Sequence, residues 1–200
     1  ILWAVTRSGR LLGMTYMPDQ NVAGWHRHET DGTFESICVV PEGDEDILYA
    51  VIRRTINGSA VRYIERMSER ALAPLEDSFF VDCGIKKTFE TETTSITGLL
   101  PVAGKTVSIL ADGGVLPNQT VSATGTLTLP VGAKKVIIGL PYVSDLQTLP
   151  AAYQAQDGSY ARGHIKNINK VWVRVYRSSG ISAGPAFESL SERKPRQNEA

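Results

Sequence analysis

The chain has 200 residues, of which 42% are hydrophobic and 21% are charged, and its 21 Lys and Arg balance 21 Asp and Glu. This composition is typical of a folded chain of one or two domains and excludes a disordered one. A net charge of zero argues against a dedicated nucleic-acid-binding module, because such modules hold phosphates with an excess of Lys and Arg. No apolar run approaches the ~20 residues of a membrane helix, so we expect no membrane partner.

Strand-like segments dominate the first part of the chain. Short apolar runs alternate with turn-forming residues, and the first three runs predict an antiparallel meander. Asn57-Gly58, the strongest short-range signal for a hairpin, joins the fifth run to the sixth. Residues 68–76 indicate a short helix. The six expected strands cover residues 2–5, 11–17, 22–28, 34–40, 47–56 and 60–67.

The composition changes near residue 85. Residues 95–160 contain only three basic and three acidic side chains, whereas residues 1–70 contain eight and ten. Ser, Thr, Gly and Pro are frequent from residue 88 to 130, which is typical of a β-domain with many short strands. A last strand is expected at residues 168–176, where alternate residues are valine. The other strands expected in this part cover residues 106–110, 119–124, 126–129 and 135–139, with a turn at 111–114.

These patterns predict an all-β fold of antiparallel sheets. The segment Ile-Leu-Trp-Ala-Val at residues 1–5 recurs as Ile-Leu-Tyr-Ala-Val at residues 47–51, and this spacing is close to the ~40–50 residues of a β-propeller blade. A partial propeller and a generic β-sheet both remain open. We predict propeller-blade-like sheets in residues 1–84, a small β-sandwich or barrel domain in 85–160, and a returning strand with a polar tail in 161–200.

The order of these parts leaves two arrangements. The small domain is either inserted within the propeller or appended to it, and the late strand favours insertion. The chain starts in an apolar run at Ile1 rather than at Met, and we expect it to be a piece of a larger protein.

The densest polar cluster contains two histidines. His26 and His28 are two residues apart, so in a strand they share a face and could hold a divalent metal. Small β-barrel metalloenzymes of the cupin type also begin with such a pair, but their next acid comes sooner than Glu35 does here. The third histidine, His164, lies beyond the domain boundary. The alternative is that the pair only lines a strand near Trp25.

No other group of residues forms a catalytic set. With three histidines and no G-x-S-x-G turn, the sequence offers no activated serine. The acidic segment 41–46 lacks the alternating spacing of a calcium loop, which favours a solvated turn. Cys38 and Cys83 lie in apolar stretches and are expected to be small core residues. We therefore expect no enzyme activity, no cofactor, and no catalytic, cofactor-binding or metal-binding residues.

Four arginines lie on the two strands of one expected hairpin, and they could form a basic stripe for nucleic acid. Cross-strand ion pairing is the more ordinary interpretation, because Glu65 and Glu69 lie among them. The four residues are Arg53, Arg54, Arg62 and Arg66.

One long stretch resembles a known family. It runs from residue 11 to residue 67, with the anchors Trp25-His26-Arg27-His28, Phe34-Glu35-Ser36 and Arg62-Tyr63-Ile64-Glu65-Arg66. It is similar to the tail nozzle proteins of short-tailed phages, also called tail tubular protein B, and to related prophage stabilisation proteins. The similarity continues through ADGGV and IIGLPYVSDLQTLP, and covers about 180 residues in all.

The resemblance implies a virion structural protein. Its relatives would be subunits of a hexameric tail tube, built on a β-propeller, that sit below the portal and adaptor in the virion tail. Such a subunit would assemble in the bacterial cytoplasm, contact the adaptor and other tail proteins, and let DNA pass during genome ejection without binding it specifically. The low-charge region 95–160 is the expected contact with a neighbouring subunit.

Two other function classes stay open. One is a metal-dependent β-barrel enzyme that uses His26 and His28. The other is a carbohydrate- or receptor-binding tail module, in which Trp3, Trp25 and Trp172 offer stacking platforms.

Overall fold

The computed structural model describes residues 1–69, 74–148, 168, 170–174 and 180–193. These residues belong to two compact units, Ile1–Asp145 and Leu146–Ala200, which we describe separately. Every sheet is antiparallel, and none of those described closes into a barrel, so the predicted all-β class is confirmed. Within the described ranges, no helix is long and apolar enough to cross a bilayer.

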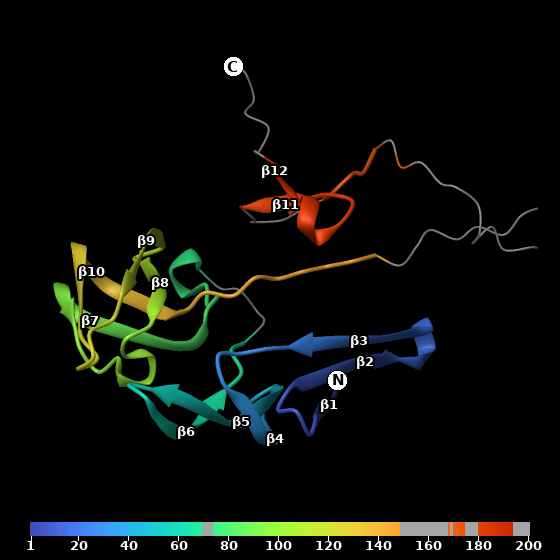
Figure 1. Ribbon diagram of the computed structural model, residues 1–200, viewed down its shortest axis with the longest axis horizontal. Helices are drawn as coiled ribbons and strands as arrows, with labels where there is room; N and C mark the ends of the chain where they lie inside the picture. Colours follow the sequence, from blue (N-terminus) through green and yellow to red (C-terminus); the bar gives the residue numbers. More distant parts are fainter. Residues whose placement is uncertain (70–73, 149–167, 169, 175–179, 194–200) are drawn as a thin grey trace, which may run out of the picture. The chain divides into compact units, whose positions relative to one another are not determined.

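The first sheet is a three-stranded meander (Figure 1). The strands pair in the order β1-β2-β3, with Trp3 opposite Gly13 and Gly13 opposite His26, which confirms the predicted meander. A 3₁₀ turn, η1 (Pro18–Gln20), connects the second strand to the third, and Asn21 closes it in the left-handed region. The bounds are β1 (Leu2–Val5), β2 (Leu11–Met17) and β3 (Val22–His28).

The second sheet contains the long hairpin that the sequence predicts. Asn57 and Gly58 have φ values of 48° and 78°, the left-handed pair that a two-residue hairpin turn requires. A bulge interrupts the pairing between Phe34 and Ser36, so that residues 35 and 36 lie side by side on one face. The strands pair in the order β4 (Thr33–Glu42), β5 (Glu45–Ile56) and β6 (Ser59–Arg66).

The third sheet has four strands in the order β7-β10-β8-β9. Its tight turn at Asp112-Gly113 has the left-handed backbone of the expected turn. Its buried core includes Ile96, Val107 and Ile138, each with at most 1% of its surface exposed. The strands are β7 (Asp82–Ile96), β8 (Thr106–Ala111), β9 (Gly114–Thr120) and β10 (Leu127–Leu140), with the 3₁₀ turns η2 (Leu75–Asp77) and η3 (Leu100–Val102).

Several predicted elements of this part are wrong. The separate strands at 126–129 and 135–139 are one strand, β10, which stays paired with β7 through register shifts. The strand expected at 119–124 ends at Thr120, and the β9 strand begins earlier, at Gly114. Of the expected helix at 68–76, residues 70–73 lie outside the described residues, and the rest contains only the 3₁₀ turn η2.

The second unit contains a small hairpin, β11 (Ile181–Ala183) and β12 (Ser191–Arg193), with the 3₁₀ turn η4 (Phe187–Ser189) between its strands. The strand predicted at 168–176 is corrected where the structure describes it, because residues 168 and 170–174 form no strand. Its other residues lie outside the described ones. The division of the chain into 1–84, 85–160 and 161–200 stays a prediction.

Candidate functional site

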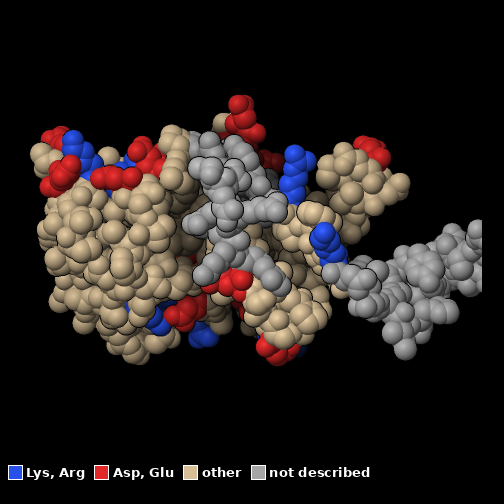
Figure 2. All heavy atoms as spheres, turned by 90° about the horizontal axis from the view of Figure 1, so that it is seen from above, with Lys and Arg blue, Asp and Glu red and all other residues tan. Residues whose placement is uncertain are grey.

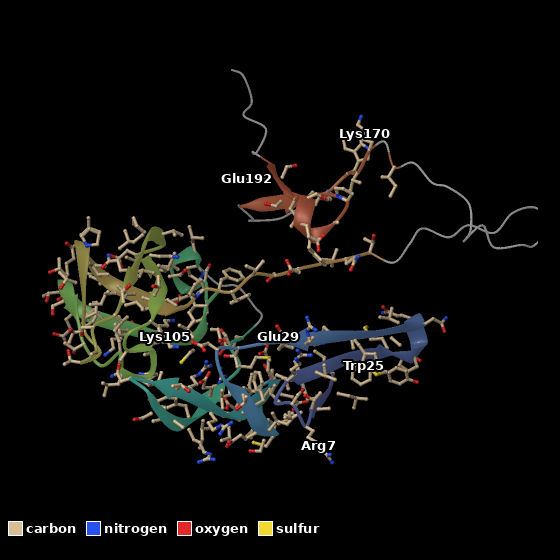
Figure 3. The ribbon with its side chains drawn as sticks, in the orientation of Figure 1. Arg7, Trp25, Glu29, Lys105, Lys170 and Glu192 are labelled. Carbon is tan, nitrogen blue, oxygen red and sulfur yellow. The ribbon has the colours of Figure 1, made fainter. Side chains whose placement is uncertain are left out.

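The outer face of the β1–β3 sheet is apolar and open to solvent. The alternation along each strand and the register place one set of side chains on it: Leu2, Ala4, Leu12, Met14, Tyr16, Ala23, Trp25 and Arg27. Trp25 is 66% exposed, Leu2 61% and Tyr16 57%. Figure 3 shows Trp25 on this sheet. Exposed Trp and Tyr on one surface are typical of protein contacts.

The inner face of the same sheet is packed. Leu11 is buried in a cluster with residues of the second sheet, and Trp3 and Val5 of β1 pack against this cluster. The meander therefore has apolar residues on both faces, and within the described chain the inner one is covered around Leu11, whereas Met17 and Val22 at its other end are 43% and 41% exposed. The cluster's other buried members are Phe34, Leu48, Ala50 and Ile52.

The two histidines lie together on this inner face, as their spacing predicts. Nδ1 of His26 and Nε2 of His28 are 2.8 Å apart and share a hydrogen bond. Trp3 packs against both rings, with centroid distances of 5.5 Å to His26 and 5.4 Å to His28. Opposite His26, only a glycine fits, because a Cβ on Gly13 would lie 2.1 Å from the His26 ring.

One nitrogen of each ring is used in the bond between the two histidines, Nδ1 of His26 and Nε2 of His28. No group of three or more ligating side chains gathers among the described residues. Glu35 lies on another sheet and bonds to arginine, while His164 lies outside the described residues. Burial lowers the pKa of His28, and the neighbouring His26 lowers it further.

A buried arginine connects three parts of the first unit. Arg54, only 2% exposed, donates from Nε and Nη2 to both carboxylate oxygens of Glu65, at 2.6 and 2.7 Å. Its Nη1 donates to the Asp31 carbonyl at 2.8 Å, and its Nη2 lies 3.5 Å from Asp82 at the start of β7. These contacts raise the pKa of Arg54 against the opposing effect of burial, so the guanidinium stays charged.

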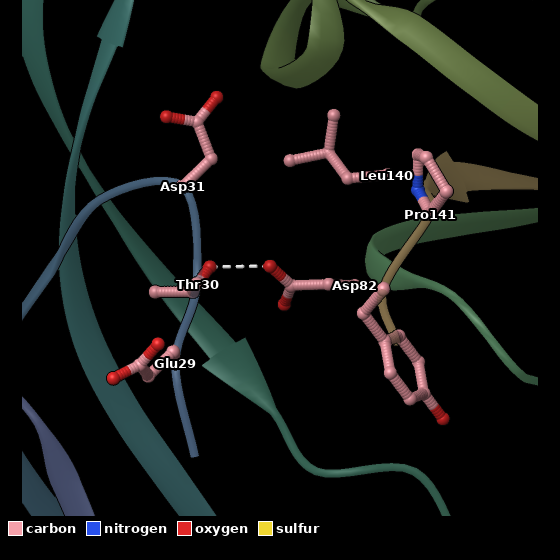
Figure 4. Close-up of a pocket in the computed structure, with 7 residues that line it drawn as sticks. Glu29, Thr30, Asp31, Asp82, Leu140 and Pro141 are labelled. Atoms are coloured by element: carbon pink, nitrogen blue, oxygen red, sulfur yellow. Dashed lines mark hydrogen bonds between the residues drawn. The ribbon is translucent and has the colours of Figure 1, made fainter. Parts of the chain in front are cut away.

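A shallow pocket of about 200 Å³ lies beside this arginine (Figure 4). Each of its three carboxylates already has a partner. Asp82 accepts a hydrogen bond from Thr30, Asp31 pairs with Lys105 at 2.7 Å, and Glu29 pairs with two arginines. The lining residues of the pocket are Glu29, Thr30, Asp31, Asp82, Leu140, Pro141 and Tyr142.

The predicted basic stripe is divided between the two faces of its sheet. Arg54 points inward, and the other three arginines point outward because they occupy alternate positions in the register. Glu35, placed on that face by the bulge, accepts from Arg62 at 2.6 Å and lies 3.7 Å from Arg53. Glu42 accepts from Arg66 at 2.9 Å and also from Tyr49.

These contacts confirm the ion-pairing interpretation, and they involve two acids besides the expected Glu65 and Glu69. Glu65 pairs with the inward arginine, and Glu69 makes only a 3.7 Å contact with Arg66. The acids that sequence reasoning missed are Glu35 and Glu42, which lie on β4. The hydrogen bond from Arg62 lowers the pKa of Glu35, and the one from Arg66 lowers the pKa of Glu42.

The cysteines and tryptophans differ in exposure. Both cysteines are free, and Cys38 is exposed rather than in the core, because its position in β4 points to the outward face. Cys83 is half-buried, and burial raises the pKa of its thiol to about 12. Of the expected stacking platforms, Trp3 packs inward, while Trp25 and Trp172 are exposed.

No protein-family model matches this sequence, and no curated protein matches it.

Proposed function

We propose that this chain is a structural subunit of a phage or prophage tail tube or nozzle, which assembles into a ring around the genome-ejection channel. The observation that carries this proposal is the outer face of the β1–β3 sheet. Trp25, Tyr16 and Leu2 are all more than half exposed there, on a regular sheet. Exposure of such an apolar face to water is unfavourable in free energy, and contact with a second protein surface would bury it.

A low-charge surface on the third sheet supports assembly as well. Figure 2 shows a broad part of this sheet on which charged side chains lie along the margins and few lie in the middle. Val115 of β9 is 82% exposed and Val131 of β10 is 52% exposed. Interface cores are depleted in charge, so this surface fits the neighbour contact expected from residues 95–160.

The pairing of the outward arginines is compatible with a channel wall that does not hold DNA as it passes. A channel lined by free arginines would hold phosphates, and its affinity would grow with each cation. Here Arg62 and Arg66 are held by the carboxylates of Glu35 and Glu42, which offsets their charge. We propose that this pairing is what lets DNA slide past without specific binding.

The two three-stranded sheets fit the blade-like role expected of residues 1–84. Each is an antiparallel meander, and they share the hydrophobic cluster around Leu11. The third sheet has a core of its own around Ile138, as an inserted or appended small domain would. We propose a partial propeller with this domain attached.

Native mass spectrometry and light scattering across a concentration series test this proposal. We expect the full chain to form a closed ring, alone or with the tail adaptor, without bound metal. The double variant Tyr16→Ser/Trp25→Ser should weaken association at least tenfold. Ile64→Ser is the matched control, because Ile64 is 76% exposed on the other sheet. A chain that stays monomeric with every tail partner, or a double variant that assembles normally, would overturn the proposal.

A further inference from the structure

The histidine pair on the inner face of the meander has a geometry that responds to protons. The two ring nitrogens are 2.8 Å apart, and one of them must donate while the other accepts. One added proton leaves this bond intact, since an imidazolium donates to a neutral imidazole. A second proton makes both nitrogens donors, so the bond is lost and two positive charges face each other.

Among the described residues of the meander, no opposite charge faces the pair to offset that repulsion. On the same face, β1 contributes Trp3 and Val5, and β2 contributes Leu11 and Gly13, none of which titrates. The neighbouring charges on the chain, Arg27 and Glu29, alternate to the other face and pair with each other at 3.1 Å.

The second sheet offers the pair no carboxylate from the shared cluster, whose residues are apolar. Of the charges at inward positions of this sheet, Arg54 and Glu65 bond to one another, and Asp46 lies opposite Pro41 at the start of β5. Tyr63 also has an inward position, opposite Ile52.

The sheet behind His26 limits how the rings can separate. The His26 ring lies 2.1 Å from the position of a Cβ on Gly13, and the Trp3 ring lies 2.8 Å from the same position. His26 therefore cannot move closer to the sheet, and we expect separation of the rings to move one of them away from Trp3. Because Trp3 packs against both rings, its indole reports on their separation.

We propose that His26 and His28 form a proton-operated latch on the meander. With no proton or one added proton the pair holds β3 against Trp3, and with two the rings part and the inner face opens. The lowered pKa of His28 agrees with this, because the folded meander resists taking up the proton that opens it. Opening is then expected on acidification below the ordinary histidine value of 6.5.

Hydrogen exchange of the full chain between pH 8 and pH 4.5, corrected for the intrinsic chemistry of exchange, tests the latch. As the pH falls from the ordinary histidine value of 6.5 to the lower titration step of the folded pair, opening of the peptides that cover residues 2–28 should increase up to about tenfold per pH unit, because the open state holds one more proton, and it should level off below that step. The opening of peptides from β10 should not change with pH. If β10 opens in step with the meander, the transition is global and the latch is wrong.

A variant in which one histidine of the pair cannot take up a proton provides a second test of the latch. His28→Gln keeps a donor and an acceptor but takes up no proton, so it should abolish the pH dependence in residues 2–28. Tryptophan emission in a Trp25→Phe/Trp172→Phe background reports on Trp3 and should shift with pH only when both histidines are present.

If the glutamine variant does not fold, NMR titration of the histidine rings in the unchanged protein still tests the latch. The latch requires two separate macroscopic titration steps for the coupled pair. A single step with both rings at ordinary values would overturn it, as would a glutamine variant with unchanged pH dependence.

Discussion

Replacing the buried arginine should destabilise the first unit more than any other arginine substitution on this hairpin. Arg54→Met keeps most of the side-chain volume but removes the guanidinium, which makes two hydrogen bonds to Glu65 and one to the Asp31 carbonyl. A buried ion pair broken on one side costs about 3–5 kcal/mol. The side chains of Glu65 and Asp82 keep 20% and 26% exposure, so water offsets part of the loss. We expect a decrease of about 3 kcal/mol in the free energy of unfolding.

Urea unfolding followed by circular dichroism measures this change, and the neighbouring arginine provides a matched control. Arg53→Met alters the same strand one residue earlier, but this side chain is 52% exposed and lies 3.7 Å from its acid. Its unfolding midpoint should hardly move. In the double variant Arg54→Met/Glu65→Met the Glu65 carboxylate is no longer left without a partner, so part of the stability should return, although Asp82 still loses its contact with the guanidinium. Equal effects of the two single variants would refute the assignment of Arg54 as the buried connection.

Two further stability predictions follow from packing. Gly13→Ala places a methyl group 2.1 Å from the His26 ring and should cost about 1–3 kcal/mol, whereas Gly24→Ala on the same sheet meets nothing within 4 Å and should cost far less. Ile138→Ala leaves a cavity in the third sheet and should cost about 2–5 kcal/mol, whereas Ile64→Ala, at 76% exposure, should change stability by under about 0.5 kcal/mol. Thermal and urea unfolding check both pairs, and either would fail if the two members behaved alike.

The hairpins were predictable because their information is local. Asn57-Gly58 and Asp112-Gly113 are the residue pairs that tolerate two successive left-handed conformations, and each closes a two-residue turn in the structure. The meander followed from short apolar runs separated by turn residues. In these segments no distant contact was needed to choose between strand and loop.

The long strands of the third sheet were not predictable in the same way. The β7 strand runs over 15 residues and is rich in Thr and Glu, with an apolar alternation too weak to mark it. Its partner, β10, carries a Pro and a Gly that suggested a break, yet register shifts accommodate them within one strand. These strands depend on pairing between residues far apart in the sequence.

The candidate site was partly visible in the sequence. Spacing correctly placed His26 and His28 on one face, because the side-chain period of a strand is two. The same period places the neighbours Arg53 and Arg54 on opposite faces of their sheet, although the sequence did not indicate which of the two is buried. Glu35 was not recognisable as an ion-pair partner, since a bulge brings it to the arginine face.

Strand β2 is apolar on both of its faces. Leu11 faces inward and is 2% exposed, while Leu12 and Met14 face outward and are also apolar. Strands that are apolar on both faces are typical of sheets covered on both sides. Within the described residues one side is covered by the cluster around Leu11, and the other presents Trp25 to solvent. The sequence of this sheet is therefore suited to a layered assembly, in which a further protein surface supplies the missing layer.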